Sequence, residues 1–132
     1  FDTKRTPTEV VRYGGTTNAY RLPTYYAAVF DKPAGFTLAD GGQFAVDDYQ
    51  KSYPAASRFK ILEQKTITLG DGSPAQVVQL KWKWTDQVTV LKSASIVALK
   101  GDKVVHFSGT TIFAGGTSME DLMKTVTSLQ LQ

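Results

Sequence analysis

The strongest constraint on the fold lies in the C-terminal half of the chain, where extended apolar segments alternate with tight turns. Four such segments are separated by short turns rich in Gly, Asp and Lys: 59–69, 75–84, 88–99 and 104–114. In the second segment the residues alternate in character, with Val78, Leu80, Trp82 and Trp84 on one face and Gln79, Lys81 and Lys83 on the other. This period of two is typical of a strand with one buried face. We therefore predict a four-stranded antiparallel meander over residues 59–114, with a β-bulge near 92–94, where the alternation slips.

Two further segments predict helices. After the last strand, Ser118 is a candidate N-cap with Asp121 three residues later, and an apolar stripe follows at helical spacing: Met119, Leu122, Met123, Val126 and Leu129. We expect this C-terminal helix to pack on the sheet. A second helix is predicted over 43–53, with Asp40 as its N-cap. The expected fold class is α+β, with a mainly antiparallel sheet.

The N-terminal third has weaker patterns. We expect residues 1–6 to form a flexible tail, 9–13 a short strand, and 19–22 and 25–30 extended segments. A chain of 132 residues with 42% hydrophobic content can build one core, so we predict a single domain over 1–132. No apolar run is long enough to cross a bilayer. The sequence begins at Phe1 and not at Met, which fits either a processed mature protein or a trimmed sequence. A removed export signal is compatible with both, and we expect export to the periplasm or cell envelope.

Charge is distributed unevenly along the chain. The net charge is +3, and residues 58–103 hold eight Lys or Arg against four acidic residues. A basic sheet surface favours acidic partners or anionic surfaces, although charged strand faces also serve simply to prevent edge aggregation. The chain has no cysteine, which excludes disulfides and thiolate chemistry.

The segment from about residue 44 to 131 resembles the PsbP-like family, named for an extrinsic subunit of the oxygen-evolving photosystem. The resemblance rests on the order of elements: a helix, the strand Phe59–Gly70, the strand Ala75–Trp84, two more strands, and a C-terminal helix ending like Val126–Leu129. It implies an α/β/α sandwich around the sheet and a protein that docks onto other proteins. Family members include lumenal photosystem subunits, bacterial envelope lipoproteins and a nuclear import factor that binds a small GTPase, so no single function follows.

Catalytic and metal chemistry has little support in the sequence. His106 is the only histidine, and Ser108, two residues further along the same strand, lies about 6–7 Å away, too far to share a hydrogen bond with it. Asp47 and Asp48 are neighbours on a predicted helix and point in different directions. The Gly-Gly-Thr-Ser segment at 115–118 could suggest an anion site, but the acidic residues that follow it favour helix capping. We predict no catalytic residue, metal site or cofactor.

Candidate binding residues are aromatic or basic. Tyr20, Tyr25 and Tyr26 could form a contact surface, because tyrosine is favoured at interfaces, although packing in the core or at the sheet edge is the favoured interpretation. Lys81 and Lys83 could contact an anionic partner, whereas Trp82 and Trp84, on the opposite strand face, are expected to be buried.

Three functional hypotheses follow from these patterns. The first is a non-enzymatic, exported bacterial binding or accessory protein that acts on another protein through an interface or small cleft. The second is a basic-surface binder of polyanions such as nucleic acid or heparin, with a lysine surface: Lys60, Lys65, Lys81, Lys83 and Lys92. The third is a hydrolase without a recognisable motif.

Overall fold

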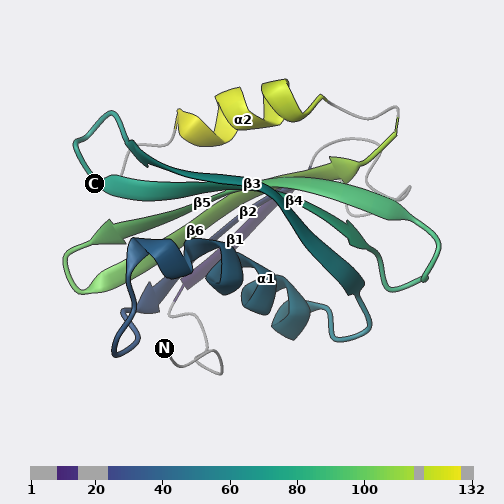
Figure 1. Ribbon diagram of the computed structural model, residues 1–132, viewed down its shortest axis with the longest axis horizontal. Helices are drawn as coiled ribbons and strands as arrows, with labels where there is room; N and C mark the ends of the chain where they lie inside the picture. The colour runs from purple at the N-terminus through teal and green to yellow at the C-terminus, as the bar shows by residue number, and fades with distance from the viewer. Residues whose placement is uncertain (1–8, 15–23, 115–117, 129–132) are drawn as a thin grey trace.

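The computed structural model describes residues 9–14, 24–114 and 118–128 (Figure 1). In chain order the elements are β1 (Glu9–Gly14), β2 (Thr24–Asp31), the 3₁₀ turn η2 (Leu38–Asp40), α1 (Gly41–Ser52), β3 (Ser57–Thr68), β4 (Pro74–Lys83), β5 (Val90–Lys100), β6 (Lys103–Ile112) and α2 (Met119–Thr127). The predictions for residues 1–6 and 19–22, and for Leu129, lie outside the described residues. The predicted strands at 9–13 and 25–30 and both predicted helices are confirmed, with small shifts of their ends.

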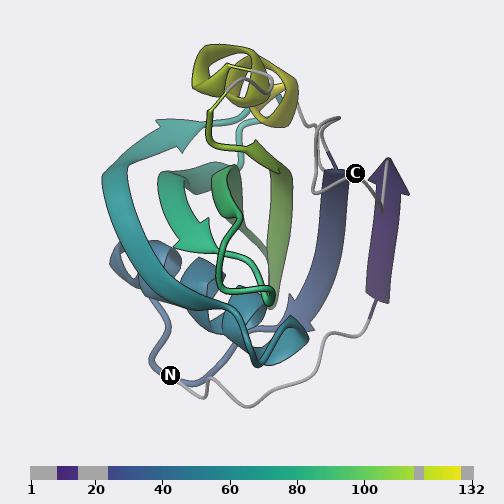
Figure 2. The ribbon, with the colours of Figure 1, turned by 90° about the vertical axis from the view of Figure 1, so that its right-hand side faces the viewer.

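The sheet is wider than predicted. Its six strands run in the order β1-β2-β6-β5-β4-β3, and every neighbouring pair is antiparallel. The meander β3–β6 is present as expected, but a sheet of four strands is wrong, because β2 pairs with β6 and β1 pairs with β2 (Figure 2). The pairing of β2 with β6 joins segments about seventy residues apart, Asp31 lying opposite Lys103, and no local pattern in either strand indicates it.

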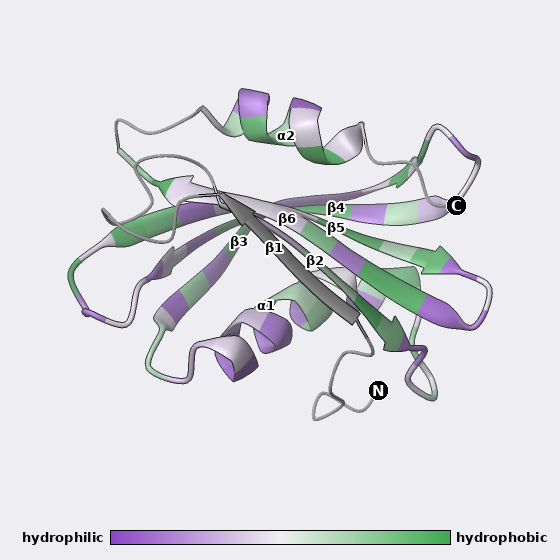
Figure 3. Ribbon diagram, turned by 180° about the vertical axis from the view of Figure 1, so that it is seen from behind, coloured by the Kyte–Doolittle hydropathy of each residue, from purple (hydrophilic) through white to green (hydrophobic). Residues whose placement is uncertain are grey.

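The two helices cover opposite faces of the sheet, α1 on one side and α2 on the other (Figure 1). The core under α1 is rich in aromatic residues such as Phe44 and Trp82, which pack with aliphatic residues such as Leu91. The core under α2 is built from smaller aliphatic residues such as Ala94 and Val126. Hydrophobic and hydrophilic residues follow one another along the strands (Figure 3). The mixed α+β class is therefore confirmed, with one helix on each face.

The N-termini of the two helices agree with the predicted caps only in part. Ser118 Oγ accepts a hydrogen bond from Asp121 N at 3.1 Å, as predicted. Asp40 is the N-cap residue of α1, but its side chain makes no capping bond to that helix. Its Oδ2 instead accepts from Thr37 N at 2.8 Å and closes the preceding turn η2. Asp40 therefore has the predicted position, but the predicted capping bond to α1 is wrong, because the carboxylate bonds to the 3₁₀ turn instead.

Close approach of the helices to the sheet requires glycine. A Cβ added at Gly41 would lie 2.7 Å from Gln76 Cβ, and one at Gly109 would lie 2.8 Å from the Tyr25 ring and 3.1 Å from Leu122. Gly41 lets the first turn of α1 rest against β4, and Gly109 leaves room on β6 for Leu122 of α2.

The irregular strand is β3 and not β5. The register between β4 and β5 continues without interruption, so the predicted bulge near 92–94 is wrong. The register shifts lie between β3 and β4, at Ser57/Lys60 and at Ile61/Glu63, and Arg58 adopts a φ of +56°. Since β3 is an edge strand, these irregularities make it a poor template for pairing with another chain.

Candidate functional site

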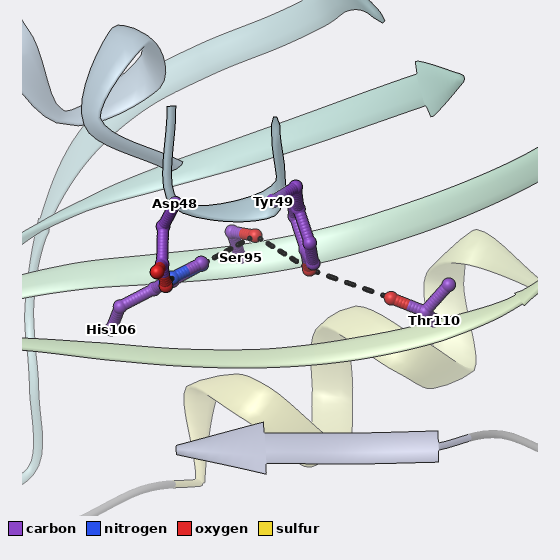
Figure 4. A network of polar contacts seen from close by, with 5 residues as sticks. All are labelled: Asp48, Tyr49, Ser95, His106 and Thr110. Carbon is purple, nitrogen blue, oxygen red and sulfur yellow. Dashed lines mark hydrogen bonds and ion pairs between the residues drawn. The ribbon is translucent and has the colours of Figure 1, made fainter. Parts of the chain in front are cut away.

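A network of polar side chains lies buried between α1 and the sheet (Figure 4). His106, on β6, has no exposed surface, and its Nδ1 lies 2.7 Å from Oδ2 of Asp48 on α1. Its Nε2 lies 3.1 Å from Oγ of Ser95 on β5. Because a carboxylate can only accept, Nδ1–H is the donor to Asp48. Three elements thus meet at one imidazole.

The order carboxylate, imidazole and hydroxyl matches the hydrogen-bond order of a nucleophilic triad. Here the hydroxyl is inaccessible, because Ser95 is completely buried and its Oγ also lies 3.3 Å from the Tyr49 hydroxyl. A nucleophile must be accessible to its substrate, and Ser95 has no exposed surface. In this arrangement the network can fix α1 on the sheet, but it cannot attack a substrate.

Tyr49 extends the network along the sheet. Its hydroxyl lies 3.4 Å from Thr110 Oγ1, which in turn lies 2.6 Å from Ser93 Oγ. The indole Nε1 of Trp82 donates to the same Ser93 hydroxyl at 3.0 Å. Burial raises the pKa of the Tyr49 hydroxyl above its ordinary value of 10.0, although hydrogen bonds with neighbouring hydroxyls act in the opposite direction. Tyr49 is therefore a neutral group at physiological pH.

A small cavity adjoins Tyr49. Its volume is about 20 Å³, and it is lined by Thr24, Tyr26, Tyr49, Ser52, Tyr53, Trp82 and Thr110. This space holds about one water molecule. It is too small for an organic substrate, so the inner site has no substrate-sized space.

The second candidate region is a surface at the end of the sheet. Two open hollows adjoin there and share Lys81 and Val90. The first, here called the apolar hollow, has a volume of about 420 Å³ and is lined by Lys81, Val88, Thr89, Val90, Ile112, Phe113 and Ala114. The second, the basic hollow, has a volume of about 280 Å³ and is lined by Arg58, Lys60, Lys81, Trp82, Lys83 and Val90.

The two hollows lie where α2 does not cover its face of the sheet. The buried residues under α2 are at the other end of the strands, for example Ala75, Val77 and Ala98. Two large apolar side chains are exposed here, Val88 at 78% and Phe113 at 38%, and two more, Ile61 and Leu62, are exposed on the edge strand β3. The Lys81 ammonium lies 4.4 Å from the centre of the Phe113 ring, a cation–π contact.

The β4–β5 turn presents Val88 through a set of hydrogen bonds to Asp86. The carboxylate accepts from the backbone N–H groups of Val88 at 2.9 Å and Thr89 at 2.8 Å, and from the Thr89 hydroxyl. The bond from the Thr89 hydroxyl, followed by those from the backbone, lowers the pKa of Asp86. The turn therefore keeps its shape while its apolar tip faces the solvent.

The four predicted binding residues that the structure describes do not lie on one surface. Tyr20 lies outside the described residues. Tyr25 and Tyr26 lie on opposite faces of β2: Tyr25 stacks with Phe107, and Tyr26 is buried with its ring 5.5 Å from that of His106. Lys81 and Lys83 are half-buried in the basic hollow. Of the four described residues, the two lysines are the pair that the structure brings together.

Other sequence predictions concern the inner network. Trp82 is buried, as expected, and Trp84 is partly buried. Asp47 and Asp48 are separated, since Asp47 accepts from Gln43 Nε2 at 2.8 Å on the outer side of α1. Sequence reasoning missed Ser95 as the hydroxyl beside His106, because it considered only residues on the same strand. The two serines at alternate positions of β5, Ser93 and Ser95, are unusual on the buried face of an apolar strand and are the signal that could have indicated it.

No family model matches the chain, and no curated protein matches its sequence. Solved structures do match its shape. PA94, a Pseudomonas aeruginosa protein of unknown function, has a TM-score of 0.65 at 14% identity, over 99% of this chain and 87% of that one. The Ran-binding protein Mog1p of Saccharomyces cerevisiae has a TM-score of 0.58 at 13% identity, over 96% and 71%. The cyanobacterial PsbP of Synechocystis sp. PCC 6803 has a TM-score of 0.51 at 15% identity, over 92% and 78%.

The chain has a PsbP/Mog1-like fold. At such low identity the likeness concerns the fold alone, so the resemblance seen in the sequence is confirmed as a fold and not as family membership. In the described part of the chain no helix is long and apolar enough to cross a membrane. Within the same residues no group of three or more His, Cys, Asp or Glu side chains could hold a metal ion.

Proposed function

We propose that the protein is a non-enzymatic binding protein that acts on another protein through the surface formed by the apolar and basic hollows. The observation that carries this proposal is the exposure of Val88 and Phe113 beside a sheet face that α2 leaves uncovered. Contiguous apolar surface with a polar rim is typical of protein interaction sites, and Val88 and Phe113 line the same hollow.

The inner network supports the same proposal. Its imidazole and hydroxyls are buried, and the adjoining cavity of about 20 Å³ has no space for an organic substrate. Mog1p, which has this fold, is described as a Ran-binding protein, so the fold is compatible with binding another protein. Export to the periplasm or envelope stays a prediction.

A second candidate function is polyanion binding, and one observation favours it. Lys60 on β3 lies opposite Lys81 on β4, and Lys81 lies opposite Lys92 on β5. A basic row of this kind attracts nucleic acid or heparin through its charge, and such binding weakens steeply as salt increases.

Site-specific photo-cross-linking in cells of the source organism tests the proposed function. A photo-reactive phenylalanine analogue replaces Val88 in one variant and Asp102, in the β5–β6 turn at the other end of the sheet, in a control. We expect one protein, identified by mass spectrometry, to be cross-linked from position 88 and not from position 102, and the product to decrease when Phe113→Ser is added. Equal products from both positions, or no protein product at all, would contradict the proposal, and nuclease-sensitive products would favour the second candidate.

A further inference from the structure

We propose that the segment of the partner that occupies the two hollows is acidic and carries one aromatic or large aliphatic side chain. This inference rests on the proposed function and specifies the chemistry of the partner. Three features support it: the charge of the basic hollow, the apolar surface beside it, and the position of Lys81 between the two.

The positive charge is concentrated by the strand register. Lys60 is opposite Lys81, and Lys81 is opposite Lys92, so three ammonium-bearing side chains lie in one row across three strands. Like charges directly opposite each other destabilise a sheet. A bound carboxylate would relieve this repulsion, so the row favours the binding of an acidic ligand.

Among the residues that the structure describes, no carboxylate forms an ion pair with a lysine of the row. Lys100, Lys103 and Lys124 do form ion pairs, with Asp71, Asp31 and Glu120, and none of these lysines belongs to the row. Two acidic residues are near. Glu63 is exposed on β3 opposite Gln79, and Asp86 is bonded to its own turn. The row therefore keeps an excess of positive charge.

The apolar hollow selects the second part of the ligand. Lys81 lies over the Phe113 ring, and Lys92 Nζ donates to the Phe113 carbonyl oxygen at 3.2 Å. Both lysines are thereby held at the boundary between the charged and the apolar surface. A ligand whose carboxylates contact the lysines would place its neighbouring side chain against Phe113 and Val88. That side chain must be apolar to gain from the contact.

The same geometry disfavours a nucleic acid. Neighbouring strands are about 4.8 Å apart, so the row of three lysines spans only about 10 Å. Grooves that follow a single strand are longer and offer aromatic faces on which successive bases stack. In this surface Phe113 is the one exposed aromatic residue among those described, and the Lys81 ammonium lies over its ring.

The test measures binding of a short fluorescein-labelled peptide of Asp and Glu with one central Phe, by fluorescence anisotropy at physiological salt. We expect Lys60→Glu to weaken binding about tenfold, because charge reversal removes an attraction and adds a repulsion. The matched control is Lys65→Glu, an exposed lysine on the same strand about five residues away, which we expect to change binding less than about twofold. Replacing the peptide Phe by Ser, or Phe113 by Ser in the protein, should weaken binding about fivefold or more.

Several outcomes would overturn the inference. Equal effects of the Lys60 and Lys65 variants would show a general charge effect, and no effect of the central Phe would remove the role of the apolar hollow. Tighter binding of single-stranded DNA or a heparin fragment than of the peptide would assign the surface to polyanions. If the peptide does not bind while cross-linking from position 88 captures a protein partner, the inference fails and the proposed function stands. If cross-linking also fails, both fail.

Discussion

The contact between Asp48 and His106 provides the sharpest test of how the helix layer is held on the sheet. The His106 ring is completely buried, and the Asp48 side chain is only 6% exposed, so the pair has almost no contact with solvent. In Asp48→Ala the Nδ1–H group keeps its burial and loses its acceptor at 2.7 Å. Leaving a neutral buried donor unpaired costs up to about 3 kcal/mol, and leaving a buried charge unpaired costs at least about that much.

We therefore expect Asp48→Ala to reduce the free energy of unfolding by about 3 kcal/mol, a large part of the roughly 5–15 kcal/mol of a typical domain. Asp48→Asn keeps an oxygen acceptor near the imidazole and loses only the charge, so its cost should be about 1–2 kcal/mol. Urea unfolding, followed by the fluorescence of the buried Trp82, measures each variant.

The adjacent residue supplies the control. Asp47 is on the same helix, and its side chain bonds only to Gln43 in the same helix among the described residues. Asp47→Ala should change stability by no more than about 0.5 kcal/mol. If Asp48→Ala costs less than about 1 kcal/mol, or no more than Asp47→Ala, the argument that this buried pair anchors α1 is refuted.

Three further predictions concern other parts of the molecule. Because the pKa of Tyr49 is raised in the folded protein, the unfolded chain loses the Tyr49 proton first as the pH rises above 10.0. The free energy of unfolding should therefore fall by about 1.4 kcal/mol per pH unit in that range. In Tyr49→Phe, urea unfolding at several alkaline pH values should show a fall with pH that is shallower by this amount. Gly109→Ala should lower the unfolding midpoint by the equivalent of about 1–3 kcal/mol, since its Cβ would lie 2.8 Å from the Tyr25 ring and 3.1 Å from Leu122, and an unchanged midpoint would show that these two side chains can move away at no cost. Lys60→Gln should raise stability by about 0.5 kcal/mol at low ionic strength by removing the repulsion from the lysine opposite it, and in thermal unfolding the gain should disappear at high salt.

The elements of the fold could be predicted because their signals are local. The alternation of Val78, Leu80 and Trp82 indicates a strand from neighbouring residues alone, and Ser118 indicates where α2 begins, because a cap needs only the next turn. The sequence also predicted that Lys81 and Lys83 lie opposite the buried tryptophan, since successive side chains in a strand point to opposite faces.

Contacts between distant segments could not be predicted from local sequence patterns and are known only from the tertiary structure. The addition of β2 to the edge of β6, the meeting of Asp48 with His106 and Ser95, and the alignment of the lysine row all join residues from different elements. Local periodicity determines which face of a strand or helix is apolar. It does not determine the register of one strand against another, or which turn of a helix lies over which strand, because these are set by the packing of the whole core.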